Sequence, residues 1–266
     1  MRNFLSDKVV NIKPSGIRKF FDIVSEMKDA ISLGVGEPDF DTPWHIRDEG
    51  IYAFERGKTF YTSNAGLKDL RLEISNYIKR TQKVEYNPDS EILVTVGGSE
   101  AIDIGLRAII NPEDEVIIPQ PSYVSYLPCA ILAGAKPVTI NLKPENDFRL
   151  TEEELDSVIT EKTKILILPF PNNPTGAIME QSDLEKIAKI CIKHDIYVTG
   201  NLLHEPITKY YTLPNGNQGG VQGVYTHMFD STATYGGTIF WKKNETNIKC
   251  INSRICFFMY DVFNWT

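Results

Sequence analysis

Two short stretches of the chain contain residues that could bind an anion at the end of a strand. The first is Gly97-Gly98-Ser99-Glu100, which lies between a β-rich run and an amphipathic run. Glycines let a ligand approach the backbone, and the first N–H groups of a helix are unpaired and partially positive. The stretch therefore suits a phosphate group. An ordinary strand-to-helix turn is the alternative, because neither a Walker loop nor Gly-x-Gly-x-x-Gly is present there.

The second stretch is Pro169-Phe170-Pro171-Asn172-Asn173-Pro174-Thr175-Gly176, which follows a predicted strand. Loops at the carboxyl ends of parallel strands are where α/β proteins bind ligands. Prolines stiffen such a loop, so that an asparagine amide can be aimed at a ligand. A turn that is merely rich in proline and asparagine is the alternative interpretation.

The elements that would position these stretches follow an α/β pattern. From about residue 91, short β-rich runs alternate with amphipathic helices, which is typical of a largely parallel, helix-covered sheet. The predicted strands are 91–96, 115–119, 137–140, 164–168 and 196–199. We expect a helix over 99–110 and two more helices opened by capping boxes at 151–154 and 182–185. Upstream, one helical face carries Leu67, Leu70, Ile74, Tyr77 and Ile78.

The composition of the chain argues against several classes of function. The 266 residues carry a formal net charge of −7 with no basic run, which argues against a nucleic-acid partner. The four cysteines are scattered without metal-ligand spacing, so we expect buried reduced thiols and no metal site. We find no signal-peptide core and no apolar run of membrane-spanning length. We therefore expect a cytoplasmic protein without a membrane partner.

Five motifs in order give the chain a resemblance to a known family. They are 32–40 (SLGVGEPDF), 61–66 (YTSNAG), 97–101 (GGSEA), 121–123 (PSY) and 171–176 (PNNPTG). In this combination the sequence resembles the class I/II, fold-type I aminotransferases, which use pyridoxal 5'-phosphate. Within the family it is most similar to the bacterial branch of aspartate aminotransferase and aminotransferase A. The resemblance implies a three-layer αβα large domain with a mostly parallel sheet.

The resemblance also implies cofactor-binding residues. Gly98, Ser99 and Glu100 would offer backbone N–H groups, and Ser99 its hydroxyl, to the cofactor phosphate. Tyr123 would stack on the pyridine ring, a contact of about 0.5–1.5 kcal/mol beyond its buried area; a core aromatic residue is the alternative. Asn173 would donate to the ring hydroxyl oxygen and help to hold the substrate carboxylate.

The resemblance further implies a reaction and an assembly. The family transfers an amino group from an amino acid to a 2-oxo acid, with the cofactor as electron sink. Gly36 would offer its backbone to the substrate carboxylate. Tyr61 would reach the cofactor phosphate of a neighbouring subunit, so a homodimer with shared active sites is implied.

The sequence departs from the family pattern after the strand at 196–199. Asn201 takes the position of the aspartate that keeps the pyridine nitrogen protonated, and His204 takes the position of a tyrosine that donates to the ring oxygen. Asparagine cannot neutralise a pyridinium ion. Losing one partner of a buried ion pair typically costs about 3–5 kcal/mol, so we expect a weakened electron sink.

The lysine that forms the Schiff base in the family is not found where the family spacing places it. Residues 230–237 contain no lysine. Lys242 and Lys243 remain candidates, although they come later and their surroundings do not match the family motif. We therefore expect aminotransferase-like chemistry by resemblance, with this chain inactive or impaired as a catalyst.

The composition changes abruptly after Pro206, which leaves three interpretations open. We favour an aminotransferase gene whose product is truncated or frameshifted, so that the small C-terminal domain and its carboxylate-binding arginine are absent. The first alternative is a non-catalytic relative that keeps the cofactor pocket as a binding or subunit protein. The second is a carbon–sulfur lyase of the same fold. The substrate amino acid is not determined by these residues.

These observations divide the chain into three predicted parts. Residues 1–45 form an N-terminal arm and substrate loop. Residues 46–206 form an incomplete cofactor-binding large domain. Residues 207–266 form a divergent tail, in which aromatic residues are frequent and acidic residues are rare.

Overall fold

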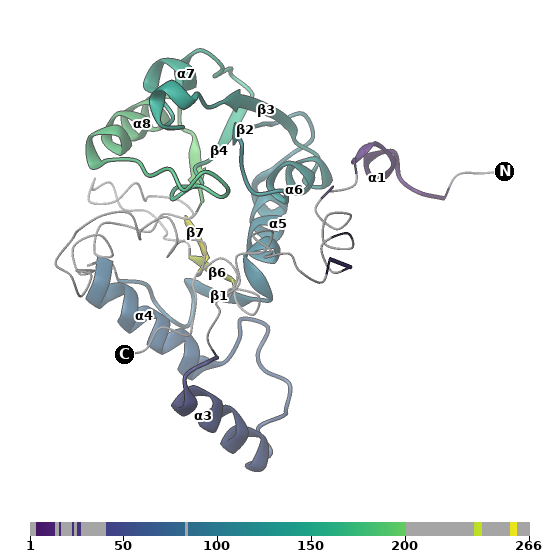
Figure 1. Ribbon diagram of the computed structural model, residues 1–266, viewed down its shortest axis with the longest axis vertical. Coiled ribbons are helices and arrows are strands. Elements are labelled where there is room, and N and C mark those ends of the chain that lie inside the picture. Colours follow the sequence, from purple (N-terminus) through teal and green to yellow (C-terminus); the bar gives the residue numbers. More distant parts are fainter. Residues whose placement is uncertain are drawn as a thin grey trace.

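A four-stranded parallel sheet is the larger of two sheets among the described residues. The computed structural model describes residues 4–13, 16, 23, 26–27, 41–82 and 85–200, and the backbone of 237–240 and 256–259. The sheet has the strand order β3-β2-β4-β5, and all neighbouring pairs run parallel (Figure 1). Its strands are β2 (Glu115–Gln120), β3 (Lys136–Asn141), β4 (Thr163–Ile167) and β5 (Tyr197–Thr199). Each of the four lies within two residues of its predicted range at both ends.

Helices cover both faces of this sheet and make three layers. Helices α5 (Gly97–Ile109) and α6 (Tyr126–Ala133) pack on one face, and α7 (Glu152–Asp156) and α8 (Gln181–Lys193) pack on the other. The remaining described helices are α1 (Asp7–Asn11), α3 (Trp44–Glu55), α4 (Lys68–Gln82) and the 3₁₀ helix η1 (Pro144–Asn146). The expected α/β class, with a mostly parallel sheet between helical layers, is confirmed.

The core divides at the sheet because successive strand residues point to opposite faces. Ile117 and Leu166 contact the α7 and α8 side, where Ile187 lies. Ile118 and Ile165 contact the α5 and α6 side. Strand segments that are buried on both faces need apolar residues at every position, which is why 116–119 of β2 and 165–167 of β4 are uninterrupted apolar stretches.

The strand predicted at 91–96 lies outside the parallel sheet. It forms β1 (Ile92–Thr95), which pairs antiparallel with β6 (Gly237–Phe240), and β6 pairs antiparallel with β7 (Cys256–Met259). The prediction of a strand was right, but its assignment to the parallel series was wrong. A short strand pattern does not specify its ladder partner, and here the partner lies more than a hundred residues further along the chain.

The starts of three helices can be compared with the capping boxes and the apolar stripe predicted from the sequence. At α7, Thr151 and Glu154 form the predicted capping box, with the Thr151 hydroxyl accepting from Glu154 N–H at 3.2 Å. At α8 the box is formed by Glu180 and Asp183, so the predicted box at 182–185 is two residues too late. In α4, the predicted stripe packs through its four later residues, while Leu67 is exposed because the helix begins after it.

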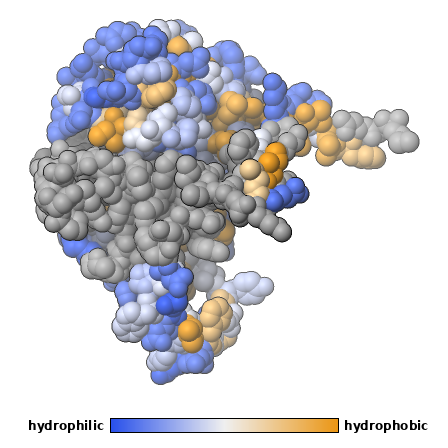
Figure 2. Space-filling model, viewed as in Figure 1, coloured by the Kyte–Doolittle hydropathy of each residue, from blue (hydrophilic) through white to orange (hydrophobic). Residues whose placement is uncertain are grey.

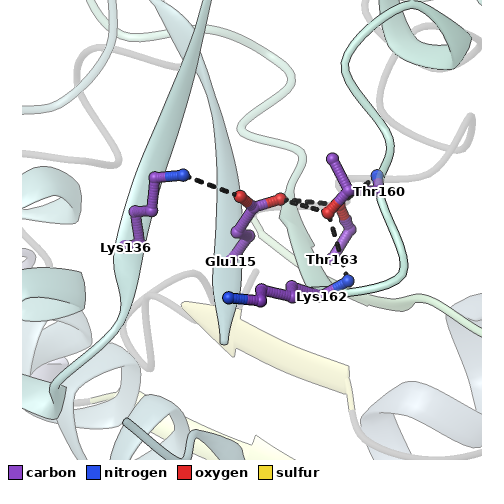
Figure 3. A network of polar contacts seen from close by, with 5 residues as sticks. All are labelled: Glu115, Lys136, Thr160, Lys162 and Thr163. Atoms are coloured by element: carbon purple, nitrogen blue, oxygen red, sulfur yellow. Dashed lines mark hydrogen bonds and ion pairs between the residues drawn. The ribbon is translucent and has the colours of Figure 1, made fainter. Parts of the chain in front are cut away.

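A polar network ties the strands together at their amino ends. Glu115, which is only 4% exposed, accepts hydrogen bonds from Thr160 Oγ1 at 2.6 Å and Thr163 Oγ1 at 3.3 Å. Its other oxygen accepts from Lys136 Nζ at 3.1 Å (Figure 3). The hydrogen bond from Thr160 lowers the pKa of the Glu115 carboxyl group against the opposing effect of burial, and Lys136 lowers it further. Glu115 is therefore a buried, fully partnered carboxylate.

The described part of the chain has neither a membrane-spanning helix nor a cluster of metal ligands. No helix in it has the length and apolar character needed to cross a membrane. Within the same residues, no group of three or more histidine, cysteine, aspartate or glutamate side chains is arranged to hold a metal ion.

Candidate functional site

Two segments, the start of α5 and the loop after β2, meet at the carboxyl edge of the sheet. The hydroxyl of Ser99, in the first turn of α5, lies 3.4 Å from the hydroxyl of Tyr123 and 3.3 Å from Oγ of Ser125. Tyr123 and Ser125 belong to the loop that follows β2. We call this group of three hydroxyls, with the start of α5, the hydroxyl cluster. The fold thus brings together two predicted site residues, Ser99 and Tyr123, that are distant in the sequence.

The start of α5 offers space as well as donors. Gly97 has a left-handed φ of 78°, and a Cβ atom added there would meet no atom within 4 Å. Gly98 is buried, and Ser99 is half-buried. The Glu100 carboxylate accepts from the backbone N–H of Val96 just before the helix. The other N–H groups of the first turn have no acceptor within the helix, so they are available to an anion.

The Tyr123 ring is held from one side. Its centroid lies 5.7 Å from that of Tyr126, with an angle of 74° between the ring planes. Tyr126 is buried among apolar residues of α5 and α6, whereas Tyr123 is half-buried. An edge-to-face contact of this kind fixes a ring while leaving part of it exposed. The ring is thus attached to the core on one side and partly accessible on the other.

The loop after β4 is organised by Asn172, a residue that the sequence interpretation did not single out. Asn172 is 3% exposed, and its Nδ2 donates to the Pro121 carbonyl oxygen at 3.1 Å. Its Oδ1 accepts from the backbone N–H of Thr175 at 3.3 Å and from the Thr175 hydroxyl at 3.1 Å. The predicted residue Asn173 follows it directly and is half-buried. Two adjacent asparagines in a loop are the available sequence signal, and the motif implies a role only for the second.

A buried hydroxyl stands at the carboxyl end of β5. Thr199 is 3% exposed, and its Oγ1 has no hydrogen-bond partner among the described residues. Thr199 pairs with Ile167, so its side chain lies on the sheet face that carries α5 and α6. Gly200 follows, and a Cβ atom there would overlap the Leu168 carbonyl oxygen. The backbone therefore passes very close to β4 at the point where β5 ends.

The other predicted site residues lie apart from the hydroxyl cluster or outside the described residues. Tyr61 is described and fully exposed. Its turn rests on β1, since Val94 N–H donates to the Ala65 carbonyl oxygen at 3.1 Å. The predicted residues outside the described ones are Gly36, Asn201, His204, Lys242 and Lys243.

The two described cysteines contribute no reactive thiol to this region. Burial raises the pKa of the Cys129 thiol to about 11, with Asp103 adding to the shift and Arg107 opposing it. Burial also raises the pKa of the Cys191 thiol to about 12. Both side chains are therefore protonated near neutral pH, and the expectation of buried reduced thiols is confirmed for these two.

The described residues fit the cofactor that the motifs imply. A phosphate group needs several N–H and O–H donors around open space, and the start of α5 combines free N–H groups, the hydroxyl cluster and the space beside Gly97. A flat aromatic ring needs an aromatic side chain to stack on, and Tyr123 is an aromatic residue that is only half-buried. A polar atom of the cofactor ring needs a hydrogen-bond partner when it is buried. Thr199 Oγ1 is a buried hydroxyl without a hydrogen-bond partner among the described residues.

Comparison with known proteins assigns the family. The model of the family "Aminotransferase class I and II" matches residues 28–205. The chain is 43% identical over 237 residues to an aspartate aminotransferase of Pyrococcus abyssi, covering 88% of this chain and 59% of that protein. It is 40% identical over 233 residues to aromatic-amino-acid aminotransferase 2 of Thermococcus litoralis, with 88% and 59% covered.

A solved structure agrees with these sequence relatives. The aspartate aminotransferase of Thermus thermophilus with maleate superimposes with a TM-score of 0.70 at 36% identity, covering 76% of this chain and 53% of that one. The chain thus spans a little more than half the length of the curated relatives it matches. Enzymes of the matched family use pyridoxal 5'-phosphate. By its sequence, its fold and the motifs gathered at the carboxyl edge of its sheet, the chain belongs to the class I and II aminotransferases.

Proposed function

We propose that this chain supplies the cofactor-binding part of an aminotransferase, which transfers an amino group from an amino acid to a 2-oxo acid. The observation that carries the proposal is the start of α5 facing the hydroxyls of Tyr123 and Ser125 through Ser99. This arrangement gathers phosphate-binding donors at the edge of a parallel sheet where α/β proteins bind ligands.

Each described residue of the site has a proposed task. Gly98, Ser99 and Glu100 bind the cofactor phosphate through backbone N–H groups, and Ser99 adds its hydroxyl. Tyr123 covers one face of the ring, and Asn173 donates to the ring hydroxyl oxygen and orients the substrate carboxylate. When bound, pyridoxal 5'-phosphate supplies the electron sink for reactions at the amino-acid α-carbon.

The catalytic competence of this chain is a separate part of the proposal. The family lysine is missing from 230–237, and Asn201 and His204 replace an aspartate and a tyrosine. We expect the cofactor to bind and turnover to be impaired or absent. Lys242 and Lys243 are the candidates for a displaced lysine, and Gly36 is the candidate for a backbone contact to substrate.

An absorbance titration with pyridoxal 5'-phosphate, followed by borohydride reduction and peptide mass mapping, tests the proposal. We expect saturable binding that weakens several-fold in Ser99→Ala and is unchanged in Ser182→Ala, a serine exposed on α8. Reduction that fixes the cofactor to Lys242 or Lys243 would support a displaced catalytic lysine. Saturable binding with no fixed lysine would support a cofactor pocket without turnover. Failure of the wild-type chain to bind the cofactor would overturn the proposal.

We also propose a homodimer that shares its active sites. None of the residues of α3 is buried, and the helix exposes apolar side chains, among them Trp44 at 72% and Phe54 at 75%. Apolar surface on α3, at the bottom of the view, is visible in Figure 2. Tyr61, also fully exposed, follows this helix in the chain and would reach the partner's phosphate. A second copy would cover this surface.

Sedimentation velocity tests the assembly. We expect a weak dimer whose fraction rises with protein concentration and falls in Phe54→Glu, whereas Glu49→Gln, a change at an exposed acidic residue of the same helix, leaves that fraction unchanged. A monomeric wild-type chain would contradict the proposal. The cytoplasmic location stays a prediction, for which cell fractionation is the test.

A further inference from the structure

A single hydrogen-bonded side chain connects the loop after β2 to the loop after β4. These two loops carry Tyr123 and Asn173, the residues proposed to face the same cofactor ring. The connection is Asn172, whose Nδ2 donates to the Pro121 carbonyl oxygen at 3.1 Å. We propose that Asn172 is a positioning residue, which holds Tyr123 and Asn173 in the relative placement that orients the bound ring. The inference rests on the function proposed above.

The contacts of Asn172 use both ends of its amide. While Nδ2 reaches the other loop, Oδ1 accepts from the N–H and the hydroxyl of Thr175 at 3.3 and 3.1 Å. The backbone of Asn172 is paired as well, since its N–H donates to the Ala177 carbonyl oxygen and its carbonyl accepts from Gly176 N–H, both at 2.8 Å. The side chain therefore cannot rotate without breaking several bonds at once.

Because Asn172 is buried, its hydrogen bonds hold the side chain in one orientation. Asn172 is 3% exposed, so neither its amide group nor a partner that it leaves can be satisfied easily by bulk water. Along the chain, the two loops are connected only through the segment that contains β3, α7 and β4. The amide therefore joins two segments that are fifty-one positions apart in the sequence.

The chemistry requires a donor and an acceptor in one short side chain. An aspartate at this position has the same shape and keeps the acceptor for Thr175, but it places an oxygen against the Pro121 carbonyl oxygen. Asn172→Asp therefore removes one donor and adds repulsion without changing volume. The matched control is Asn146→Asp, the same chemical change at an exposed residue of η1.

The experiment measures cofactor affinity and the visible circular dichroism of bound pyridoxal 5'-phosphate, which reports the fixed orientation of its ring. Asn172→Asp is expected to weaken the Kd about tenfold, as follows from losing one buried hydrogen bond. At saturating cofactor it is also expected to lose most of the dichroic signal. Asn146→Asp is expected to change neither. A residue that only stabilised the fold would leave the signal of the saturated protein unchanged.

The outcomes separate this inference from the proposed function. If the wild-type chain does not bind the cofactor, both fail. If the wild-type chain binds and Asn172→Asp keeps the wild-type affinity and dichroism, the positioning role alone is overturned. Should Asn172→Asp not fold, Thr175→Val replaces it, with Thr175→Ser as the conservative variant. Loss of the signal in Thr175→Val and its retention in Thr175→Ser would support the role, and equal signals would overturn it.

Discussion

Replacing Glu115 by glutamine should lower the free energy of unfolding in a pH-dependent way. The substitution keeps the size of the side chain and one acceptor, but it removes the charge from a carboxylate that is 4% exposed. In the native protein this carboxylate accepts from Thr160 at 2.6 Å, Thr163 at 3.3 Å and Lys136 at 3.1 Å. Glu115→Gln therefore removes the charge and one of the two acceptor oxygens at nearly constant size.

The magnitude follows from the three partners. A hydrogen bond to a charged group contributes about 1.5–3 kcal/mol and a neutral one about 0.5–1.5 kcal/mol. The difference is about 1 kcal/mol for the short bond from Thr160 and less for the longer one from Thr163. The Lys136 side chain is 64% exposed, so its ion pair adds at most about 1 kcal/mol. We expect a total loss of about 2 kcal/mol at pH 7.

The pH dependence has a defined sign. Hydrogen bonds from Thr160 and Lys136 lower the pKa of Glu115 in the folded state below its ordinary value of 4.5. The charged carboxylate therefore contributes its stability above that value, and the contribution is lost as the pH falls through the lowered pKa. The difference between the wild-type chain and Glu115→Gln should shrink over this acidic range.

Urea denaturation at neutral and acidic pH measures this difference. Glu161→Gln, at an exposed residue next to Thr160 in the sequence, is the matched control and should unfold with the wild-type midpoint. Two results would refute the reasoning. One is a loss at pH 7 no larger than that of the control, and the other is a loss that stays constant as the pH falls.

Three further predictions follow from buried side chains. Leu166→Ala removes a fully buried residue of β4 and should lower the free energy of unfolding by about 2–5 kcal/mol, whereas Ile192→Ala on the exposed side of α8 should cost far less in the same denaturation assay. Thr199→Val removes a buried hydroxyl that has no partner among the described residues, so the cofactor-free protein should gain about 1 kcal/mol while its Kd for pyridoxal 5'-phosphate rises; a destabilised variant in calorimetry would contradict this. Because burial raises the pKa of Cys129 and Cys191 to about 11 and 12, both should resist iodoacetamide at pH 8 until the protein unfolds, as peptide mapping would show.

The parallel sheet was predictable because each of its strands is indicated by the residues of the strand itself. Runs such as Val116–Ile118 are buried on both faces, so they must be apolar at every position, and the intervening helices carry capping and amphipathic patterns. The pairing of β1 with β6 was not predictable, because the sequence of a four-residue strand does not determine which distant strand it pairs with. The box at α8 was misplaced because Glu180 serves as the N-cap, outside the preferred set of cap residues.

The site was predictable to the extent that its residues lie in motifs. Ser99 and Tyr123 were identified by resemblance, and the structure places their hydroxyls 3.4 Å apart. Asn172 and Thr199 were missed for a physical reason. They are distinguished by burial and by partners on other segments, or by the lack of one, and neither property is visible in the local sequence.

The polar network and the hydroxyl cluster stand at opposite ends of one strand. Glu115 is the first residue of β2, and Tyr123 follows its last residue, Gln120. A six-residue strand separates its ends by about 16 Å, and substitutions that far apart usually have additive effects on stability. Substitutions near the hydroxyl cluster can therefore accumulate without disturbing the Glu115 network at the amino ends of the strands. For an evolving or engineered chain, selection on specificity and selection on folding act on separate sets of residues.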